Sequence, residues 1–439
     1  MHGSEMYAHA SFVLGVMVVS FIAIFIAGKK LKQDIPIAVI LFLICVIGAL
    51  AGGYGVPVRH LFEGMSFYIY INLVILTGMV FLQVMKSSGN LDAITWDILM
   101  GFHRRPIILF CLLTLILFLP GMVTGIGTAA VLTTGTFVAV ILMTLGIPRT
   151  ETAVILALVT TFGAAAPPVN LPAMIISGGI NMPYSGFSLV LLLLTVPAGL
   201  FSFFWIGYRH FKVLSREEIK KKLPEPERPN AWMPYVPIGV VAVLFLLIRF
   251  FPFHMIDLIT PAVFMIGSLV GLFTGKKVNY FKASKEAMSG GLFTVVALLF
   301  VVGTVVQITT LSGVKGLLVI GALTISSFSV AILYFVMALS LPLLGGVLTH
   351  LGAAAILGVP FALALLTKNA IIVVAAASIF CVIAQLVPPS AVGGYFAKQV
   401  TELKTYAPIL KKCIVPVIVS SIWTILVMIF ANPISKILI

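Results

Sequence analysis

The chain has 439 residues, of which 61% are hydrophobic and only 9% are charged, and its mean hydropathy is +1.20. Lys and Arg number 27 against 13 Asp and Glu, so the formal net charge is +14. Because a soluble domain has about 25% charged residues, this composition excludes a soluble globular enzyme and a disordered chain. It also excludes a nucleic-acid-binding protein, since the basic residues lie between long apolar runs. We interpret the chain as an all-α polytopic protein of a lipid bilayer.

Eight apolar runs are each long enough for one membrane crossing, which needs about 20 residues. They predict helices at 10–28, 35–53, 66–86, 187–207, 232–250, 258–274, 289–311 and 413–431. Two longer uncharged runs, 106–146 and 327–366, are interrupted by clusters of Gly and Thr, and we interpret each as a re-entrant hairpin. Two further runs, 150–182 and 369–397, are interrupted by Pro-Pro pairs and predict broken helices that cross once.

The segment 90–103 has apolar residues at helical spacing, with Asp92 and Asp97 on the opposite face. The expected apolar face consists of Leu91, Ile94, Ile98, Leu99 and Phe102. This pattern predicts an interfacial helix that lies along the cytoplasmic surface and braces the first hairpin.

The distribution of basic residues predicts the orientation of the chain. With the N-terminus outside, 22 of the 27 Lys and Arg residues lie on the inner side. The positive-inside rule favours this arrangement, whether the hairpins are re-entrant or cross twice. The expected location is a cell's inner (cytoplasmic) membrane.

The two halves of the sequence match. Pro167-Pro168 in the first half corresponds to Pro388-Pro389 in the second, and the starts of the predicted spans correspond at nearly the same shift. Each half crosses five times if a hairpin counts as zero, so the second half is inverted. We predict a first repeat over 1–208, a basic cytoplasmic linker over 209–231 and a second repeat over 232–439. Inverted repeats with broken helices are typical of secondary transporters.

The hairpin tips and helix breaks are the candidate sites. Proline lacks an N–H group and frees the carbonyl four residues earlier, and such carbonyls cannot face lipid. Together with Thr, Ser and Asn oxygens, they form a set of hard ligands suited to Na⁺. The half-helix N-termini after each break suit an anionic carboxylate. The alternative is that Pro and Gly only kink these helices.

His350 lies in the middle of a long apolar stretch. It is a candidate proton carrier or substrate ligand, and the alternative is a neutral histidine that is hydrogen-bonded to a hairpin carbonyl. The sequence has no nucleotide-binding loop, HExxH, paired carboxylates or CxxC. We therefore expect no enzyme activity and no cofactor, and any uphill transport draws on an ion gradient.

Several motifs resemble a known family. TTFGAAAPPVNLPAMIISGG with LLLLTVPAGLF in the first half, and GVLTHLGAAAILGVP with IAQLVPPSAVGGYFA in the second, resemble the large membrane subunit of TRAP (tripartite ATP-independent periplasmic) transporters. These belong to the ion transporter superfamily. The resemblance implies a Na⁺-coupled importer of small organic acids such as dicarboxylates, with an elevator motion. It also implies a small four-helix membrane subunit and a soluble substrate-binding protein as partners.

The resemblance also implies site residues. One Na⁺ would lie between the first tip and the first break, and a second ion between the second tip and the second break. The Na⁺ candidates are Thr124, Gly125, Gly127, Thr128, Gly163, Pro167, Pro168, Gly346, Thr349, Gly352, Gln385, Pro388 and Ser390. The substrate-binding candidates are Thr124, Asn170, Thr349, His350 and Ser390.

Two departures from the family pattern leave the coupling ion open. The first tip reads TGIGTA where the family tends to have a Ser-Gly-Ser-Ala-like run, and His350 stands where the family usually has an acidic residue. H⁺ coupling is therefore an alternative to Na⁺. A stand-alone secondary anion transporter of the same superfamily is the second hypothesis, and a membrane scaffold or receptor without transport is the third.

Overall fold

The computed structural model describes residues 3–30, 35–227, 230–250, 258–289 and 291–438, and within these ranges the chain is helical with no β-strand. Seven of the described helices are long and apolar enough to cross a membrane. Three predicted spans, 35–53, 232–250 and 258–274, form shorter apolar helices. Two of the seven long helices are instead the first arms of the predicted hairpins. The expectation of an all-α, multi-pass membrane protein is confirmed.

The helices of the first half and the linker follow one another with short connections. They are α1 (Gly3–Lys30), α2 (Ile37–Ala51), α3 (Val58–Ser66), α4 (Ile69–Ser87), α5 (Asn90–Phe102), α6 (Pro106–Thr124), α7 (Gly127–Leu132), α8 (Thr134–Thr144), α9 (Arg149–Ala165), α10 (Leu171–Gly179), α11 (Ser188–Gly207), η1 (Tyr208–His210) and α12 (Arg216–Lys222).

The second half begins with η2 and repeats a similar order. Its elements are η2 (Met233–Tyr235), α13 (Val236–Phe250), α14 (Thr260–Gly271), α15 (Tyr280–Met288), α16 (Gly291–Leu311), α17 (Val314–Phe328), α18 (Val330–Leu348), α19 (His350–Ala353), η3 (Ala354–Gly358), α20 (Val359–Ala364), α21 (Ala370–Ile383), η4 (Ala384–Leu386), α22 (Val392–Val400), α23 (Ala407–Ile429) and α24 (Ala431–Leu438). For example, α16 corresponds to α4 and α21 corresponds to α9, and the starts of both pairs are separated by nearly the same shift in sequence.

Both uncharged runs fold back on themselves. In the first, α6 ends at a tip at residues 125–126, and the chain returns through α7 and α8, both of which pack against α6. In the second, α18 ends at Thr349, and the chain returns through α19, η3 and α20. The turns lie where the Gly and Thr clusters predicted them. Whether the hairpins re-enter the membrane stays a prediction.

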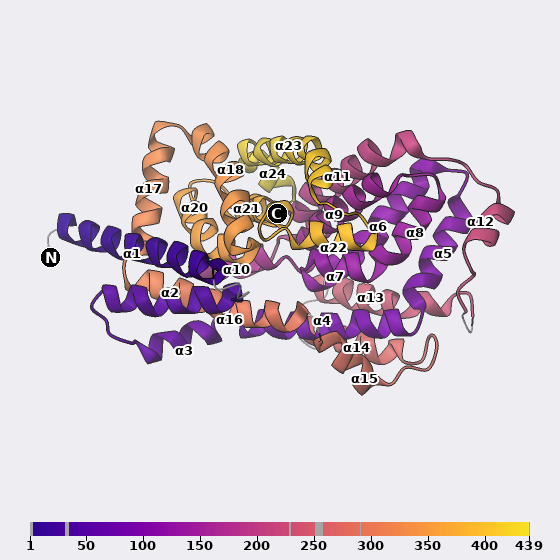
Figure 1. Ribbon diagram of the computed structural model, residues 1–439, viewed down its shortest axis with the longest axis horizontal. Helices are drawn as coiled ribbons and strands as arrows, with labels where there is room; N and C mark the ends of the chain where they lie inside the picture. Colours follow the sequence, from indigo (N-terminus) through magenta and orange to yellow (C-terminus); the bar gives the residue numbers. More distant parts are fainter. Residues whose placement is uncertain (1–2, 31–34, 228–229, 251–257, 290, 439) are drawn as a thin grey trace.

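The helices form two layers (Figure 1). The lower layer in that view consists of α1–α4 and α13–α16, in which α16 packs on α2 and α3 and α14 packs on α4. The upper layer consists of α5–α11 and α17–α24. The N-terminus lies at the left of this view and the linker helix α12 at the right, at opposite ends of the long axis.

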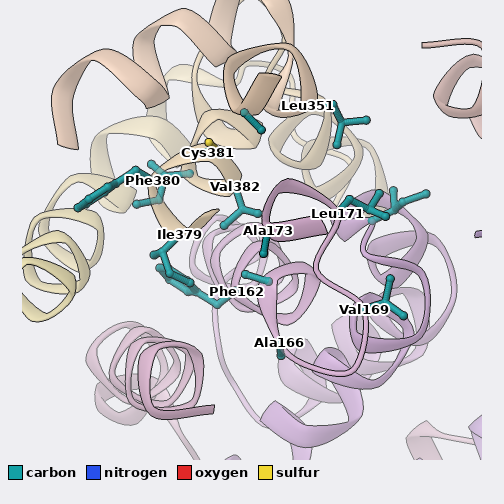
Figure 2. Close-up of a cluster of buried hydrophobic side chains, with 14 of the residues drawn as sticks. Phe162, Ala166, Val169, Leu171, Ala173, Leu351, Ile379, Phe380, Cys381 and Val382 are labelled. Carbon is teal, nitrogen blue, oxygen red and sulfur yellow. The ribbon is translucent and has the colours of Figure 1, made fainter. Parts of the chain in front are cut away.

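The broken helices occupy the centre of the upper layer. Every residue of α9 from Glu151 to Ala165 is buried, and so is every residue of α21 from Ile372 to Ile383. Figure 2 shows side chains from both halves gathered there, including Phe162, Ala166, Val169, Ile379, Phe380 and Val382. This packing places α9 and α21, which precede the two Pro-Pro breaks, against each other in the core.

The amphipathic helix α5 is buried more widely than its pattern predicted. Leu91, Ile94 and Leu99 of the expected apolar face are buried, but so are Thr95 and Trp96 outside it. The reason is that α5 packs against α4, α6 and α8 together. Its position against the first hairpin agrees with a bracing role.

Charged residues gather at the linker end of the molecule. Glu151 at the start of α9 pairs with Lys412 of α23 and lies 3.8 Å from His210, so the ion pairs join the two halves. Lys276 pairs with Glu227 at 2.9 Å, and the hydrogen bond from its ammonium group holds the pKa of the Glu227 carboxyl below its ordinary value. Of the basic residues assigned to the inner side, Lys32 and Arg228 lie outside the described residues.

One close helix crossing in the lower layer depends on two glycines. A Cβ atom at position 303 would lie 2.1 Å from the carbonyl oxygen of Gly64, and one at position 64 would lie 2.6 Å from the Cα of Thr304. Both distances are too short for a side chain, so α3 and α16 can cross only where both residues are glycine.

We predict that Gly303→Ala lowers the stability of the protein by about 1–3 kcal/mol, because α3 and α16 must move apart. The matched control is Gly321→Ala in α17, where a Cβ atom meets nothing within 4 Å and where alanine favours the helix. Thermal unfolding of the two purified variants in detergent checks this. Equal melting temperatures would contradict the close crossing.

Candidate functional site

Both broken helices are interrupted where the sequence places a Pro-Pro pair. The first break spans residues 166–170 between α9 and α10, and the second spans 387–391 between η4 and α22. Both prolyl pairs contain a cis peptide bond. Because proline cannot donate a hydrogen bond, each break leaves helix carbonyls without their usual partners. These groups lie beside the buried core and need other partners.

Each break is hydrogen-bonded to the hairpin tip of its own half. The N–H of Val169 donates to the carbonyl of Met122 at 3.2 Å, and the N–H of Ser390 donates to the carbonyl of Gly346 at 2.8 Å. The two donors lie at matching positions of the repeat, directly after the two Pro-Pro pairs, and the two acceptors lie near the ends of the matching helices α6 and α18. The same backbone contact therefore occurs once in each half.

Glycines allow the tips to approach the broken helices. A Cβ atom at position 121 would lie 2.6 Å from the carbonyl carbon of Gly163, and one at position 345 would lie 2.4 Å from the Cβ of Ala384. The sequence predicted that each tip meets its own break, and the structure brings these segments together.

The two tips turn through different residues. Gly125 has φ 68° and ψ 15°, a left-handed conformation that glycine adopts freely. The corresponding Thr349 has φ 78° and ψ 158°, which is strained for a β-branched residue. Its hydroxyl accepts a hydrogen bond from the N–H of Gly352 at 3.4 Å. Backbone strain of this kind is concentrated at functional sites.

The side chain of Gln385 crosses to the first tip. Its neighbours Ala384 and Val387 pack on Gly345 and Gly346 of the second tip. Its side-chain oxygen, however, would lie only 2.8 Å from a Cβ atom at Gly127. Gln385, which the resemblance groups with the second ion, therefore brings its amide to the first tip.

A small group of residues, made of two threonines, two glycines and Gln385 itself, forms the surroundings of this contact. We name it the Gln385 cluster and define it as Gly127, Thr160, Thr161, Gln385 and Gly393. The carbonyl of Thr160 would lie 3.1 Å from a Cβ atom at Gly127, and the hydroxyl of Thr161 would lie 3.8 Å from one at Gly393. The Thr161 hydroxyl and the Gln385 side-chain nitrogen are buried and have no hydrogen-bond partner. Unpartnered buried polar atoms are costly, and each needs an explanation.

Thr160 and Thr161 were not among the predicted site residues. They lie more than one helical turn before the first proline of the break, and the sequence pattern pointed only to the prolines and the residues near them. The signal that was available is the Thr-Thr pair itself, which begins the motif TTFGAAAPPVN and interrupts the apolar part of α9. In the structure the Thr160 hydroxyl donates to the carbonyl of Leu156 at 2.7 Å, whereas Thr161 has no such bond.

Asn170 is fully engaged in holding the first break. Its side-chain oxygen accepts from the N–H of Ala173 at 3.0 Å and so caps α10. Its side-chain nitrogen donates to the carbonyl of Ala165 and to the hydroxyl of Ser378, both at 2.8 Å. The second bond ties the first break to α21 of the other half. The arrangement favours a structural role for this predicted substrate ligand.

Thr124 is likewise occupied within the first tip. Its hydroxyl donates to the carbonyl of Pro120 at 2.7 Å and accepts from the N–H of Ile126 at 3.2 Å. The hydroxyl therefore stabilises the turn. An ion at this tip would bind backbone carbonyls or the Gln385 cluster more readily than this side chain.

His350 begins α19 at the second tip. The ring atom Nε2 is buried and has no hydrogen-bond partner, which does not support the alternative of a bond from that atom to a hairpin carbonyl. Among the described residues, no group of three or more His, Cys, Asp or Glu side chains could hold a metal ion.

The other predicted residues differ in their burial. Gly163, Pro167 and Gly352 are buried, Thr128 is half-buried and Pro388 is exposed. Ser390 donates its hydroxyl to the carbonyl of Val347 at 3.4 Å.

Pro168 lines a cavity of about 310 Å³ between the two layers, whose other walls include Phe67, Tyr68, Tyr70, Met174, Tyr184 and Thr260.

Comparison with known proteins supports the fold. No protein-family model matches the chain, and no curated protein matches it in sequence. Among solved structures, it is similar to the YdaH transporter of Alcanivorax borkumensis, whose crystal structure is described as revealing an unusual topology. The TM-score is 0.60 at 16% identity, over 85% of this chain and 88% of that one. At this identity the likeness concerns the fold, which the chain shares with that transporter.

We predict that Asn170→Ala lowers the stability by about 2–4 kcal/mol, because it removes a helix cap and leaves two buried acceptors without their donors. The matched control is Asn369→Ala, which removes only the cap bond that the Asn369 side-chain oxygen accepts from the N–H of Ile372 at the start of α21 and is expected to cost about 1 kcal/mol. Thermal unfolding in detergent compares them. Equal losses would show that the bond between the halves contributes nothing.

Proposed function

We propose that the chain is an ion-gradient-driven transporter that imports small organic acids by alternating access. The observation that carries this proposal is the repeated contact of a hairpin tip with a Pro-Pro break, Val169 to Met122 and Ser390 to Gly346. Broken helices that meet at one place provide amide groups for an anion and carbonyls for a cation. The likeness of the fold to a transporter supports the same conclusion.

Two features support an inverted repeat with the N-terminus outside. The order of the helices recurs at a nearly constant shift in sequence, as α9 and α21 or α4 and α16 illustrate. An odd number of crossings in each half inverts the second half relative to the first. The basic linker then lies in the cytoplasm, as the positive-inside rule requires, and the protein lies in the inner membrane.

The two layers suggest an elevator motion. The upper layer contains both hairpins and both broken helices, and the lower layer contains neither. Side-chain hydrogen bonds between the layers include those of Tyr68 with the carbonyl of Ile175, of Lys86 with the carbonyl of Leu132 and of Asn90 with the hydroxyl of Thr274. We propose that the upper layer moves as one body against the lower layer, which acts as the scaffold.

The Gln385 cluster is the ion site that we propose for Na⁺. Na⁺ binds neutral oxygens, and the cluster contains the Thr160 carbonyl and the Gln385 amide oxygen beside Gly127 and the Thr161 hydroxyl beside Gly393. An ion there would also explain the unpartnered Thr161 hydroxyl. His350 at the second tip is the candidate for H⁺ coupling instead of, or in addition to, Na⁺.

The motifs that resemble TRAP transporters further suggest partners and a substrate class. On this proposal the chain is the large membrane subunit, which works with a four-helix membrane subunit and a soluble substrate-binding protein to import acids such as dicarboxylates. The described upper layer provides helix N-termini after each break as the anion-binding groups. A stand-alone transporter of the same superfamily is the alternative.

We predict that Thr161→Val raises the Na⁺ concentration that gives half-maximal uptake roughly tenfold, because it removes one ion ligand. Thr160→Val is the matched control, since that hydroxyl already bonds to Leu156 and the backbone carbonyl remains. Uptake into proteoliposomes as a function of Na⁺ concentration measures both. If no ion binds here, Thr161→Val leaves the Na⁺ dependence unchanged, because it only removes an unpartnered hydroxyl.

We predict that proteoliposomes containing the chain accumulate a small carboxylate only when an inward Na⁺ gradient and both partner proteins are present. The measurement uses a panel of radiolabelled carboxylates with imposed Na⁺ or H⁺ gradients, with and without the partners. Uptake by this chain alone would favour the stand-alone transporter. Uptake driven by H⁺ and lost in His350→Gln would move the coupling to the second tip, and the absence of uptake in every arm would contradict transport.

A further inference from the structure

The short helix α15 lies on the side of the molecule that carries the linker. Ala283 and Ala287 are buried against Val80 and Val84 of α4. The turn before α15 is tied to the same side, since the Lys276 ammonium pairs with Glu227 of the linker. On the other side of the helix, Phe281, Lys282, Lys285 and Met288 are exposed.

Exposed aromatic side chains are concentrated around this helix. Phe281 on α15 is 84% exposed, Phe273 on the preceding turn is 80% exposed and Phe293 on α16 is 75% exposed. These are three of the four most exposed aromatic side chains among the described residues. Such side chains at the ends of membrane spans lie at the level of the lipid headgroups.

The same surface carries lysines without acidic partners. Lys277, Lys282 and Lys285 are exposed, and none of them forms an ion pair with a carboxylate among the described residues. The nearby Glu286 instead accepts a hydrogen bond from Gln83 at 2.8 Å. Glu286 keeps its negative charge in this bond, so the three lysines and Glu286 together leave this surface with a net positive charge.

The corresponding helix of the first half shows that the fold does not require this charge. The helix α3 also precedes a long helix and presents an exposed aromatic side chain, Phe62, at 65% exposure. There, however, Arg59 pairs with Glu63 at 2.7 Å, and the helix has no lysine. The excess positive charge belongs only to α15, which lies on the linker side.

We propose that α15 and the turn before it form a binding site for anionic phospholipids of the leaflet on the linker side. Lys277, Lys282 and Lys285 bind the headgroup phosphates, and Phe281 enters the boundary between headgroups and acyl chains. The combination of exposed aromatic rings with unpaired lysines fits a lipid better than a free anion, which has no apolar part. This inference does not depend on the transported substrate.

The test is a lipid titration of the purified full chain in mild detergent, followed by native mass spectrometry. Because each lysine near an anionic leaflet contributes roughly fivefold to binding, we expect K277Q/K282Q/K285Q to bind phosphatidylglycerol at least tenfold more weakly. Its binding of phosphatidylcholine should not change. The matched control is K220Q/K221Q/K222Q in α12, which removes the same charge and should retain phosphatidylglycerol binding within about twofold.

Two further measurements test whether the ligand is a phospholipid or a soluble phosphate. Phe281→Ala should weaken the binding of both lipids, and glycerol phosphate without acyl chains should not compete. The proposal is overturned if the α15 variant binds phosphatidylglycerol like the unmodified chain, or if the two triple variants lose equal affinity. Competition by glycerol phosphate would assign the lysines to a soluble anion. Lower uptake with unchanged lipid binding would assign them to a protein partner.

Discussion

The structure depends on one constraint, which is that polar backbone groups within an apolar core must be hydrogen-bonded. Two Pro-Pro pairs interrupt helices beside that core, and the N–H groups of Val169 and Ser390 that follow them donate to the carbonyls of Met122 and Gly346 at the hairpin tips. The glycines at 121 and 345 follow from the same requirement, since the tips must come within backbone contact. The hairpins and the breaks therefore stabilise each other, and neither is satisfied alone.

The two halves meet this constraint differently. The first break is closed by the side chain of Asn170, whose three hydrogen bonds leave little capacity for a ligand. The second break has no such cap, and its Gln385 side chain extends to the other half. Unpartnered polar atoms remain at Thr161, Gln385 and His350. The first break is therefore held mainly by hydrogen bonds within the protein. The polar atoms that are free to bind a ligand lie around the second break and at Thr161.

Much of this arrangement could be predicted from the sequence. Apolar length predicts the helices, Pro-Pro and Gly-Thr clusters predict the breaks and tips, and the family resemblance implies which tip meets which break. The contacts between the two halves could not be predicted. The bond from Asn170 to Ser378 and the crossing of Gln385 to Gly127 join residues of different halves, and spacing within a half carries no information about them. Thr161 was missed because only its lack of a partner, not its position, distinguishes it from Thr160.

The crossing of Gln385 also has a thermodynamic consequence. A residue from the second break contributes to the surroundings of the first tip, so an ion held in the Gln385 cluster touches both halves at once. On the proposed function, the free energies of binding at the two tips are then linked. Linkage is reciprocal, so occupancy at one tip changes the affinity at the other by the same factor in both directions. Such a transporter resists uncoupled transport. When one ligand dissociates, the affinity for the other falls before the upper layer can move.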